Sequence, residues 1–599
     1  MASATTYRKN YTAPTHWVDK VDLIFDLHPQ RTRVRSTLTV RPNENRPNDD
    51  FLLNGRDLEL ISITVNNHEL ARTEYAILDS GDLLLHGISE PSTIKIENVI
   101  NPTANTSLLG LYVSNNNFMT QCEAEGFRRI TYYPDRPDVM AKFTVRINAP
   151  KSVCPVLLSN GNLVEEGEID NNWHYTRWED PFKKPAYLFA LVAGDLKCRE
   201  ERFTLKNGKK ALLQIWVEPR NLDKTEFALE SLKKAIAWDE KRFGLELDLE
   251  RFMIVATDDF TMGAMENKGL NIFNSRCILA TPAVATDKDF ARIESVIAHE
   301  YLHNWTGNRV TCRDWFQLTL KEGLTVFREQ EFAADMLGDP TARAVKRIED
   351  VRYLRDRQFA EDAGPMAHPI RPESYQEINN FYTTTVYEKG AEVIRMMQTL
   401  LGKEGFRRGL DQYIRLHDGS AATCDDFLDA MAKANMRDLS QFERWYSQAG
   451  TPHVLVETHW NPRAGSYTVT LTQSCAATPG QPKKEPFFIP FDIALINAKG
   501  NPIPLQLQAE TAAKGTSRVL ELTETQQSWT FINIREKPVP SLARNFSAPI
   551  IVDYDYTPDE LVFLSQHDND PFNRAEAMEK LSMLCIDEMV ADFEHGTRM

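Results

Sequence analysis

The period of the hydrophobic pattern changes twice along this sequence of 599 residues. Up to about residue 195, apolar and polar residues alternate, as they do from Val21 to Leu27, which predicts β-strands. From residue 196 to 449 the spacing becomes helical around short apolar runs, which indicates a mixed α/β domain. Over residues 450–556, about seven short strand-like segments return, the pattern of a β-sandwich.

Residues 557–599 are expected to hold two helices. Thr557 can cap the first helix, Pro558 suits its first position, and Glu560 completes a capping box. Two short helices bury little apolar surface by themselves. We therefore expect a C-terminally truncated chain that ends at the start of an incomplete helical domain.

These segments predict a multidomain α+β protein. Its expected parts are an N-terminal antiparallel β domain (1–195), a catalytic α/β domain (196–449), a β-sandwich (450–556) and the start of a helical domain (557–599).

Composition excludes several classes of protein. The net charge of −16 and the lack of a dense Lys/Arg run argue against nucleic-acid binding. The longest apolar stretch, residues 186–194, is far shorter than the ~20 residues that span a bilayer, and residues 1–10 show no secretory signal. Eight cysteines without a CxxC pair suit a reducing compartment. We expect a cytoplasmic protein without a membrane span.

A metal-binding motif, His-Glu-Tyr-Leu-His, occupies residues 299–303. Apolar spacing before it predicts a helix, and histidines at i and i+4 share one helix face. His299 and His303 can therefore hold one Zn²⁺ at about 2.0–2.1 Å. Glu300 is placed to act on water at the metal rather than to bind the metal. The alternative is a surface helix with two unrelated histidines.

A third ligand is needed, and Glu322 is the candidate. It lies nineteen positions after His303, at the start of a second predicted helix with apolar Leu320 and Leu324. A helix–loop–helix can bring it back to the first helix. The alternative for Glu322 alone is a solvated carboxylate.

Two histidines and one glutamate leave a coordination position open, as catalytic zinc sites do. Zinc polarises a carbonyl and lowers the pKa of its water, while Glu300 can take the proton and deliver it to a leaving amine. The pattern predicts zinc-dependent amide hydrolysis with one Zn²⁺ per chain. It does not separate an endopeptidase from an exopeptidase.

Further motifs carry a family resemblance. Gly-Ala-Met-Glu-Asn stands at residues 263–267, ahead of the His-Glu-Tyr-Leu-His motif. The segments QCEAEGFR (121–128), DRPD (135–138), MAHP (366–369) and VYEKG (386–390) accompany it. Together they resemble the gluzincin zinc aminopeptidases, and most closely the bacterial aminopeptidase N branch. The likeness runs through essentially the whole chain.

The resemblance implies a thermolysin-like catalytic domain and a role for each matching residue. His299, His303 and Glu322 would ligate zinc, Glu300 would be the general base, and Tyr387 would donate its hydroxyl to the oxyanion. By composition alone, Tyr382 is a rival for Tyr387.

The same resemblance implies the substrate-binding residues: Gln121, Glu123, Met262, Gly263, Ala264, Met265, Glu266 and Asn267. Glu123 and Glu266 would bind the free α-amino group of the peptide. The backbone of residues 263–265 would lie along the substrate as an edge strand. Gln121 and Met262 would line the first side-chain pocket, where methionine can adapt to different residues. Without the resemblance, Glu123 and Glu266 could be ordinary exposed carboxylates.

The expected function is a monomeric, cytosolic aminopeptidase of broad specificity that acts on peptides with a free N-terminus. The alternative is a silent truncated fragment that binds zinc and peptides without turnover. A zinc hydrolase of the same family that opens an epoxide is a third reading, which the peptidase-like motifs disfavour.

Overall fold

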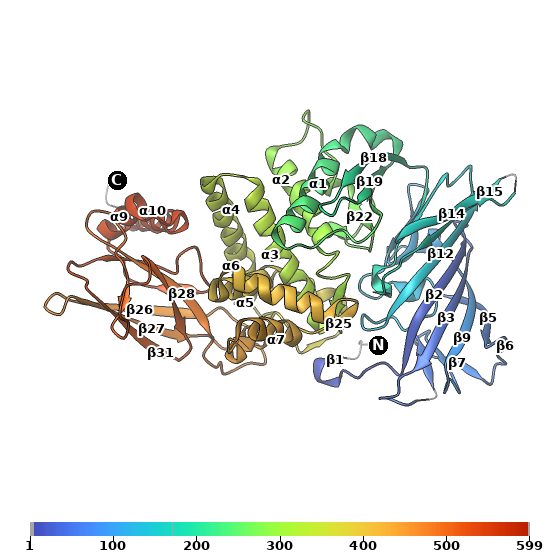
Figure 1. Ribbon diagram of the computed structural model, residues 1–599, viewed down its shortest axis with the longest axis horizontal. Helices are drawn as coiled ribbons and strands as arrows, with labels where there is room; N and C mark the ends of the chain where they lie inside the picture. The colour runs from blue at the N-terminus through green and yellow to red at the C-terminus, as the bar shows by residue number, and fades with distance from the viewer. Residues whose placement is uncertain (1–4, 49, 171, 597–599) are drawn as a thin grey trace. The chain divides into compact units, whose positions relative to one another are not determined.

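The computed structural model describes residues 5–48, 50–170 and 172–596, and Figure 1 labels its elements. The chain divides into two units, each described here by itself. The first comprises Met1–Lys321, Ser374–Asn380 and Tyr413–Thr423, and the second comprises Glu322–Glu373, Phe381–Gln412 and Cys424–Met599. Their boundary falls inside one helix, α3 (Leu318–Met336).

The N-terminal part of the first unit is built on one large sheet. In spatial order its strands are β14 (Asn162–Glu168), β15 (Trp173–Glu179), β12 (Met140–Pro150), β2 (His16–Asp26), β3 (Thr32–Pro42), β9 (Ser92–Ile100), β5 (Glu59–Val65) and β6 (His68–Glu69), with β16 (Lys184–Pro185) paired to β12.

The predicted alternation holds along β2. Val21, Leu23 and Phe25 are at most 1% exposed, so one face of the strand enters the core. The expected antiparallel domain needs one correction, because β12 pairs with β2 in parallel, with Phe143 opposite Val21. Alternation reports which face of a strand is buried and not the direction of its neighbour.

Smaller sheets complete this part of the chain. One four-stranded sheet contains β10 (Gly110–Ser114), β11 (Asn117–Gln121), β17 (Leu191–Gly194) and β13 (Val156–Ser159). A three-stranded sheet contains β4 (Phe51–Leu53), β8 (Leu83–Leu85) and β7 (Tyr75–Ile77). The short pair β1 (Thr6–Tyr7) and β24 (Ser374–Tyr375) joins two distant segments.

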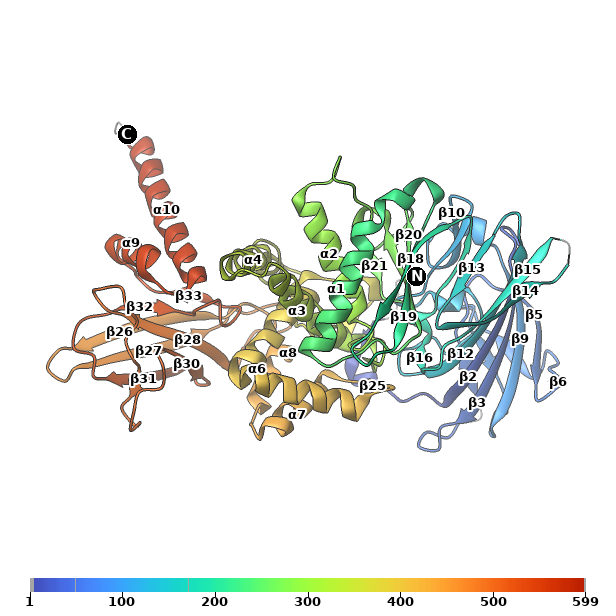
Figure 2. The same cartoon turned by 45° about the horizontal axis from the view of Figure 1, so that its top comes forward.

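A five-stranded sheet and two helices follow in the same unit. The strand order is β18 (Lys197–Thr204), β19 (Lys210–Val217), β20 (Arg251–Thr257), β22 (Leu270–Asn274) and β21 (Ala264–Met265). Helices α1 (Glu226–Arg242) and α2 (Asp287–Leu302) lie side by side next to this sheet (Figure 2). A parallel pair, β23 (Val310–Cys312) and β25 (Ser420–Ala422), follows α2.

The second unit begins with helices. They are α3 from Glu322 onward, α4 (Pro340–Tyr353), α5 (Ala360–Asp362), α6 (Gly390–His417, interrupted at Gly402) as far as Gln412, α7 (Cys424–Asn435) and α8 (Arg444–Ser447). Two segments, η8 (Leu354–Phe359) and η10 (Thr385–Lys389), are π-helical turns that the sequence analysis did not predict.

The β-sandwich of the second unit has two sheets. One contains β29 (Gln506–Leu507), β31 (Gln526–Ile532), β27 (Ser466–Ser474), β26 (His453–Asn461) and β33 (Ile551–Asp553), and the other contains β30 (Ser517–Leu522), β28 (Ile489–Ile496) and β32 (Val539–Leu542). Each of the seven predicted segments overlaps an observed strand. Strand β32 was not predicted, because its Pro540 breaks the hydrophobic alternation.

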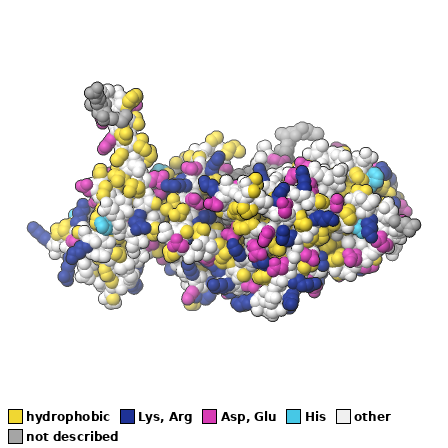
Figure 3. Space-filling model, turned by 90° about the horizontal axis from the view of Figure 1, so that it is seen from above, with side chains coloured by type: hydrophobic (Ala, Val, Ile, Leu, Met, Phe, Trp, Pro, Cys, Tyr) yellow, Lys and Arg dark blue, Asp and Glu magenta, His cyan; other side chains and the backbone are white. Residues whose placement is uncertain are grey.

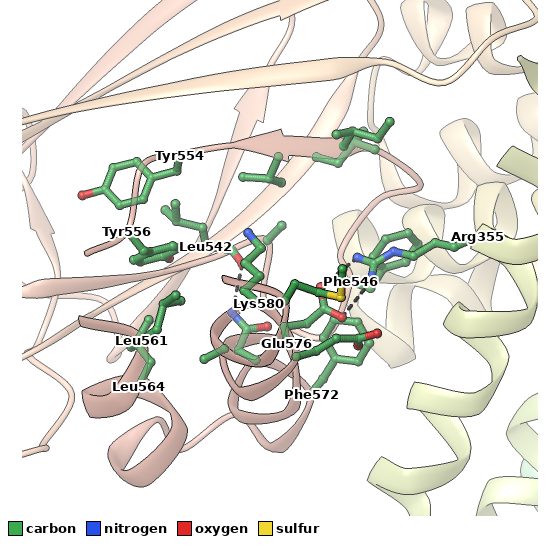
Figure 4. A pocket seen from close by; sticks show the side chains of 18 of the residues that line it. Arg355, Leu542, Phe546, Tyr554, Tyr556, Leu561, Leu564, Phe572, Glu576 and Lys580 are labelled. Atoms are coloured by element: carbon green, nitrogen blue, oxygen red, sulfur yellow. Dashed lines mark hydrogen bonds and ion pairs between the residues drawn. The ribbon is translucent and has the colours of Figure 1, made fainter. Parts of the chain in front are cut away.

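Two helices end the described chain. Helix α9 (Pro558–His567) has the predicted capping box between Thr557 and Glu560, and α10 (Pro571–Glu594) follows it. Arg355 pairs with Glu576 of α10 through two contacts of 2.7 and 2.9 Å, beside Phe546 and Phe572 (Figure 4).

The rest of α10 extends away from the sandwich (Figure 2). Hydrophobic side chains follow this helix in Figure 3, and seven large ones are 40–74% exposed: Met578, Met583, Leu584, Ile586, Met589, Val590 and Phe593. Within the described ranges, no helix is both long and apolar enough to cross a bilayer.

Candidate active site

Helix α2 carries the His-Glu-Tyr-Leu-His motif at its C-terminal end. A capping box between Thr286 and Asp289 starts the helix, and His303 is its C-terminal cap. The Nε2 atoms of His299 and His303 are 3.0 Å apart. Two ligands at about 2.0–2.1 Å from one tetrahedral ion lie about 3.3 Å apart, so this pair fits a single zinc ion.

The loop after the helix fixes the ring of His303. Its Nδ1 lies 2.9 Å from the carbonyl oxygen of Thr306, which keeps the proton on Nδ1 and directs the lone pair of Nε2 toward a metal. Gly307 has φ +151°, and a Cβ on it would lie 2.8 Å from Nδ1 of His303. Only glycine leaves room for this ring.

The third predicted ligand joins the histidines. Donor atoms of His299, His303 and Glu322 all lie within 4.8 Å of one another. Glu322 directly follows Lys321 in helix α3, so the continuous helix determines its position. Two nitrogen donors and one carboxylate form the ligand set of a catalytic zinc site. These residues therefore fit the metal that the motif predicts.

The predicted base lies beside this group. Glu300 is 6% exposed, and carboxylate oxygens of Glu300 and Glu266 lie within 4.8 Å of each other and of a His303 nitrogen. A buried carboxylate next to the candidate metal ligands is positioned to exchange a proton with a reacting water.

Residues 263–267 form the edge of the five-stranded sheet. Strand β21 pairs on one side with β22, where Met265 is opposite Ile272, and it is the last strand in the sheet order. The amide of Asn274 also donates to the carbonyl of Gly263 at 2.9 Å. Met262, Gly263 and Ala264 are half-buried. An edge strand leaves backbone groups available to an extended peptide.

A lysine that the sequence analysis did not single out lies between the two predicted amine-binding carboxylates. Lys321 Nζ is 2.8 Å from Glu123 and 2.6 Å from Glu266, and all three side chains are at most 4% exposed. One ammonium between two carboxylates leaves a charge of −1, which a substrate ammonium would balance. In the sequence the lysine is marked by nothing except its place beside Glu322.

The remaining predicted substrate residues are buried. Gln121, at the end of β11, is 1% exposed and donates to the carbonyl of Glu123 at 3.3 Å. Asn267 is fully buried, and neither atom of its amide has a hydrogen bond to another described residue. Buried amides are normally hydrogen-bonded, so the side-chain amide of Asn267 is an exception among the described residues.

A polar network supports the loop that follows the zinc-binding helix. Asp248 accepts from Lys268 at 2.6 Å, from Arg309 at 2.8 Å and from Asn304 at 3.1 Å, and Lys268 also donates to Asn304 at 2.8 Å. Burial by itself would raise the pKa of Asp248, but the two cations outweigh it and lower the pKa below its ordinary value. No local pattern in the sequence predicted this network.

Tyr387 lies in the second unit, in the π-helical turn η10. Glu361 holds the start of this turn: its carboxylate accepts from Thr384 Oγ1 at 2.8 Å and from the amide and Oγ1 of Thr385 at 2.8 and 2.6 Å. π-helical turns are frequent at functional sites. The role of Tyr387 stays a prediction.

Two more contacts hold the turn. Lys389 forms a buried pair with Asp362 at 2.6 Å and donates to the carbonyl of Gly450 at 2.9 Å. His368 contacts Thr383 Oγ1 at 2.9 Å and the carbonyl of Met366 at 2.8 Å. His368 is thus a hydrogen-bonded loop residue.

Comparison with known proteins defines the family. Residues 227–446 match the peptidase family M1 domain, residues 13–188 match the peptidase M1 N-terminal domain, and residues 450–555 match a domain of unknown function with an Ig-like fold. The chain belongs to the peptidase M1 family, whose aminopeptidases are zinc metalloproteases.

Individual relatives support the same family assignment. The chain is 51% identical over 590 residues to aminopeptidase N of Escherichia coli, covering 98% of this chain and 66% of the relative. It is 48% identical to aminopeptidase N of Haemophilus influenzae, covering 100% and 68%. A crystal structure of Legionella pneumophila aminopeptidase A with aspartic acid superimposes with a TM-score of 0.88, at 34% identity, over 100% of this chain and 66% of that one. The chain thus spans about two thirds of the length of these relatives.

Proposed function

We propose that this chain is a zinc-dependent aminopeptidase that removes N-terminal residues from peptides with broad specificity. The observation that carries the proposal is the pairing of two sites: a His299, His303 and Glu322 donor set within 4.8 Å, and buried carboxylates beside it. The first suits zinc, and the second suits an ammonium. An exopeptidase needs both, because it must hold the chain end next to the bond that it breaks.

His299, His303 and Glu322 would hold one zinc ion, which would supply Lewis-acid polarisation of the scissile carbonyl and activation of water. Glu300 takes the proton of the attacking water and then delivers it to the leaving amine. Tyr387 donates its hydroxyl to the oxyanion that develops on the carbonyl. The proton thus moves through Glu300 and is not lost to solvent.

Glu123 and Glu266 bind the α-ammonium group, and the ammonium of Lys321 lowers the net charge of the pair from −2 to −1. The outer edge of β21 pairs with the extended peptide, and Asn267 lies two residues after this strand. Gln121 and Met262 line the pocket for the first side chain, where a flexible methionine accommodates several residues. We further propose a monomer located in the cytosol, and the four predicted domain borders are part of this proposal.

The test uses the purified chain with Ala- and Leu-p-nitroanilide, with and without a chelator, and a zinc measurement on the same sample. We expect chelator-sensitive turnover and about one zinc per chain. An α-N-acetylated substrate should not be cleaved, because it offers no ammonium to Glu123 and Glu266. Zinc without turnover would contradict the proposal and favour a silent peptide-binding fragment. Cleavage of the acetylated substrate would contradict the role of the two carboxylates.

A further inference from the structure

A separate cavity of about 530 Å³ lies in the first unit, away from the candidate active site. Strands β13, β14 and β15 line one side of it, and strands β19 and β20 line the other. Its size is within the usual range of small-molecule sites. Its described lining includes none of the residues predicted to bind metal or substrate.

The pairing of β19 with β20 places three polar side chains, Gln214, Trp216 and Arg251, at this cavity. In the parallel pair β19 and β20, Leu212 is opposite Arg251, and Gln214 and Trp216 follow at two-residue steps along β19. Side chains two positions apart share a face, and so do directly paired residues. Arg251, Gln214 and Trp216 therefore project from the same face of the sheet, and all three line the cavity.

The two donors at this face lack partners. The guanidinium of Arg251 has no hydrogen bond or ion pair to another described residue, and it lies 5.3 Å from the ring centre of Trp178. Burial lowers its pKa, so the surrounding carboxylates do not fully replace the lost water. The indole Nε1 of Trp216 is buried, also with no partner in the described chain.

The third side chain offers an acceptor. Gln214 is 5% exposed, and its Nε2 donates to Glu200 at 2.7 Å, which fixes the orientation of the amide. Its Oε1 is buried without a partner among the described residues. Buried polar atoms are normally paired, so two donors and one acceptor at one face define a site with specific polar requirements.

The lining also includes apolar and aromatic side chains, Leu157, Leu158, Leu163, Tyr175 and Trp178, and ionisable ones, Lys151, Glu166, Glu168 and His174. We propose that this cavity binds an N-acylated amino acid with an apolar side chain. Its carboxylate would accept from Arg251 and Trp216, its amide N–H would donate to Gln214 Oε1, and its side chain would pack on the aromatic wall. The C-terminal residue of a peptide presents the same chemistry.

The test is calorimetric titration of the full chain with N-acetyl-L-phenylalanine, which lacks the free amine that the candidate active site requires. N-acetyl-L-phenylalaninamide keeps the ring and the amide but has no carboxylate, and should bind about tenfold more weakly or worse. Arg251→Gln should lose a similar factor for the acid. Arg202→Gln is the matched control, because Arg202 is exposed on the neighbouring strand β18 and does not line the cavity.

Equal affinity of the acid and the amide, or no detectable binding of the acid, would overturn the proposal without any variant being made. Unchanged affinity in a folded Arg251→Gln protein would overturn it too. An N-acetylated hexapeptide ending in phenylalanine separates the two sources of the ligand. Binding as tight as that of the small acid assigns the site to peptide ends, and weaker binding assigns it to the free acyl amino acid. Neither readout depends on peptidase activity.

Discussion

At the scale of single residues, neighbouring positions of helix α2 face different directions and have different proposed roles. Successive side chains of a helix point about 100° apart, so His299 and His303 face one point while Glu300 faces another direction. The structure shows the result: the two Nε2 atoms are 3.0 Å apart, and Glu300 lies beside them with its carboxylate close to Glu266. Metal binding and proton transfer are thereby separable by mutation.

Glu300→Ala is expected to lower kcat by at least about 10²–10⁴-fold, because the reacting water loses its proton acceptor. Zinc content should stay unchanged, since Glu300 is not one of the three proposed donors, His299, His303 and Glu322. The measurement is kcat for Leu-p-nitroanilide together with zinc analysis of the same protein. Loss of zinc from this variant would place Glu300 among the metal ligands and would refute the assignment.

At the scale of elements, the candidate site depends on how segments end. Helix α2 ends at His303, and Gly307 lets the following loop turn back against the imidazole. Strand β21 is short and lies at a sheet edge, so it can accept a further strand. Arg309 joins the returning loop to Asp418 through two contacts of 2.8 and 2.7 Å.

Gly307→Ala should weaken zinc binding, because the new Cβ would lie 2.8 Å from Nδ1 of His303 and displace the ring. Zinc affinity is measured by competition with a chelator. Gly208→Ala is the control: Gly208 also has a positive φ (+84°), but nothing lies within 4 Å of the added methyl group. A similar loss in both variants would mean that backbone strain, and not the histidine contact, is responsible.

Asp248→Asn should destabilise the protein at neutral pH by about 3–5 kcal/mol, because the buried ammonium of Lys268 would lose its carboxylate and Arg309 would keep only its pair with Asp418. The pKa of Asp248 is lowered on folding, so its contribution is present above the ordinary carboxyl pKa and is lost as pH falls through the folded value. Denaturant unfolding of both proteins from pH 7 downward checks this. The difference should shrink in acid, and a difference that grows there would contradict the ion-pair account.

At the scale of the whole molecule, three matched domain families and a candidate metal site are combined in a single chain. Glu322 lies where the two units meet in sequence, at the first residue of the second one. A metal that binds only the folded protein stabilises it by mass action. Zinc would therefore link the integrity of helices α2 and α3 to the stability of the chain.

Zinc removal is expected to lower the unfolding temperature of the wild-type chain. The free energy by which zinc stabilises the folded chain grows with the ratio of free zinc to Kd, and it reaches about 2.7 kcal/mol when free zinc is a hundred times Kd. Glu322→Ala should show almost no response to added zinc, since it lacks one donor. Differential scanning calorimetry with and without chelator measures both. An equal response of the two proteins would show that the stabilising metal binds somewhere else.

Local patterns in the sequence determined the local structure. The i, i+4 spacing predicted a helix with two histidines on one face, and the capping box at Thr557 and Glu560 predicted the start of α9. Alternation predicted the buried face of β2 and most strands of the sandwich. These features succeed because hydrogen bonds and side-chain directions within a few residues of the chain decide them.

Only the tertiary structure decided which distant groups meet. Lys321 reaches Glu266 across 55 positions, β12 runs parallel to β2, and Asp248 pairs with Lys268 and Arg309. No local pattern encodes these contacts, because burial of a lysine or an aspartate is favourable only when a partner arrives from another element. The sequence determined which helix can bind a metal, and packing determined the charges that surround it.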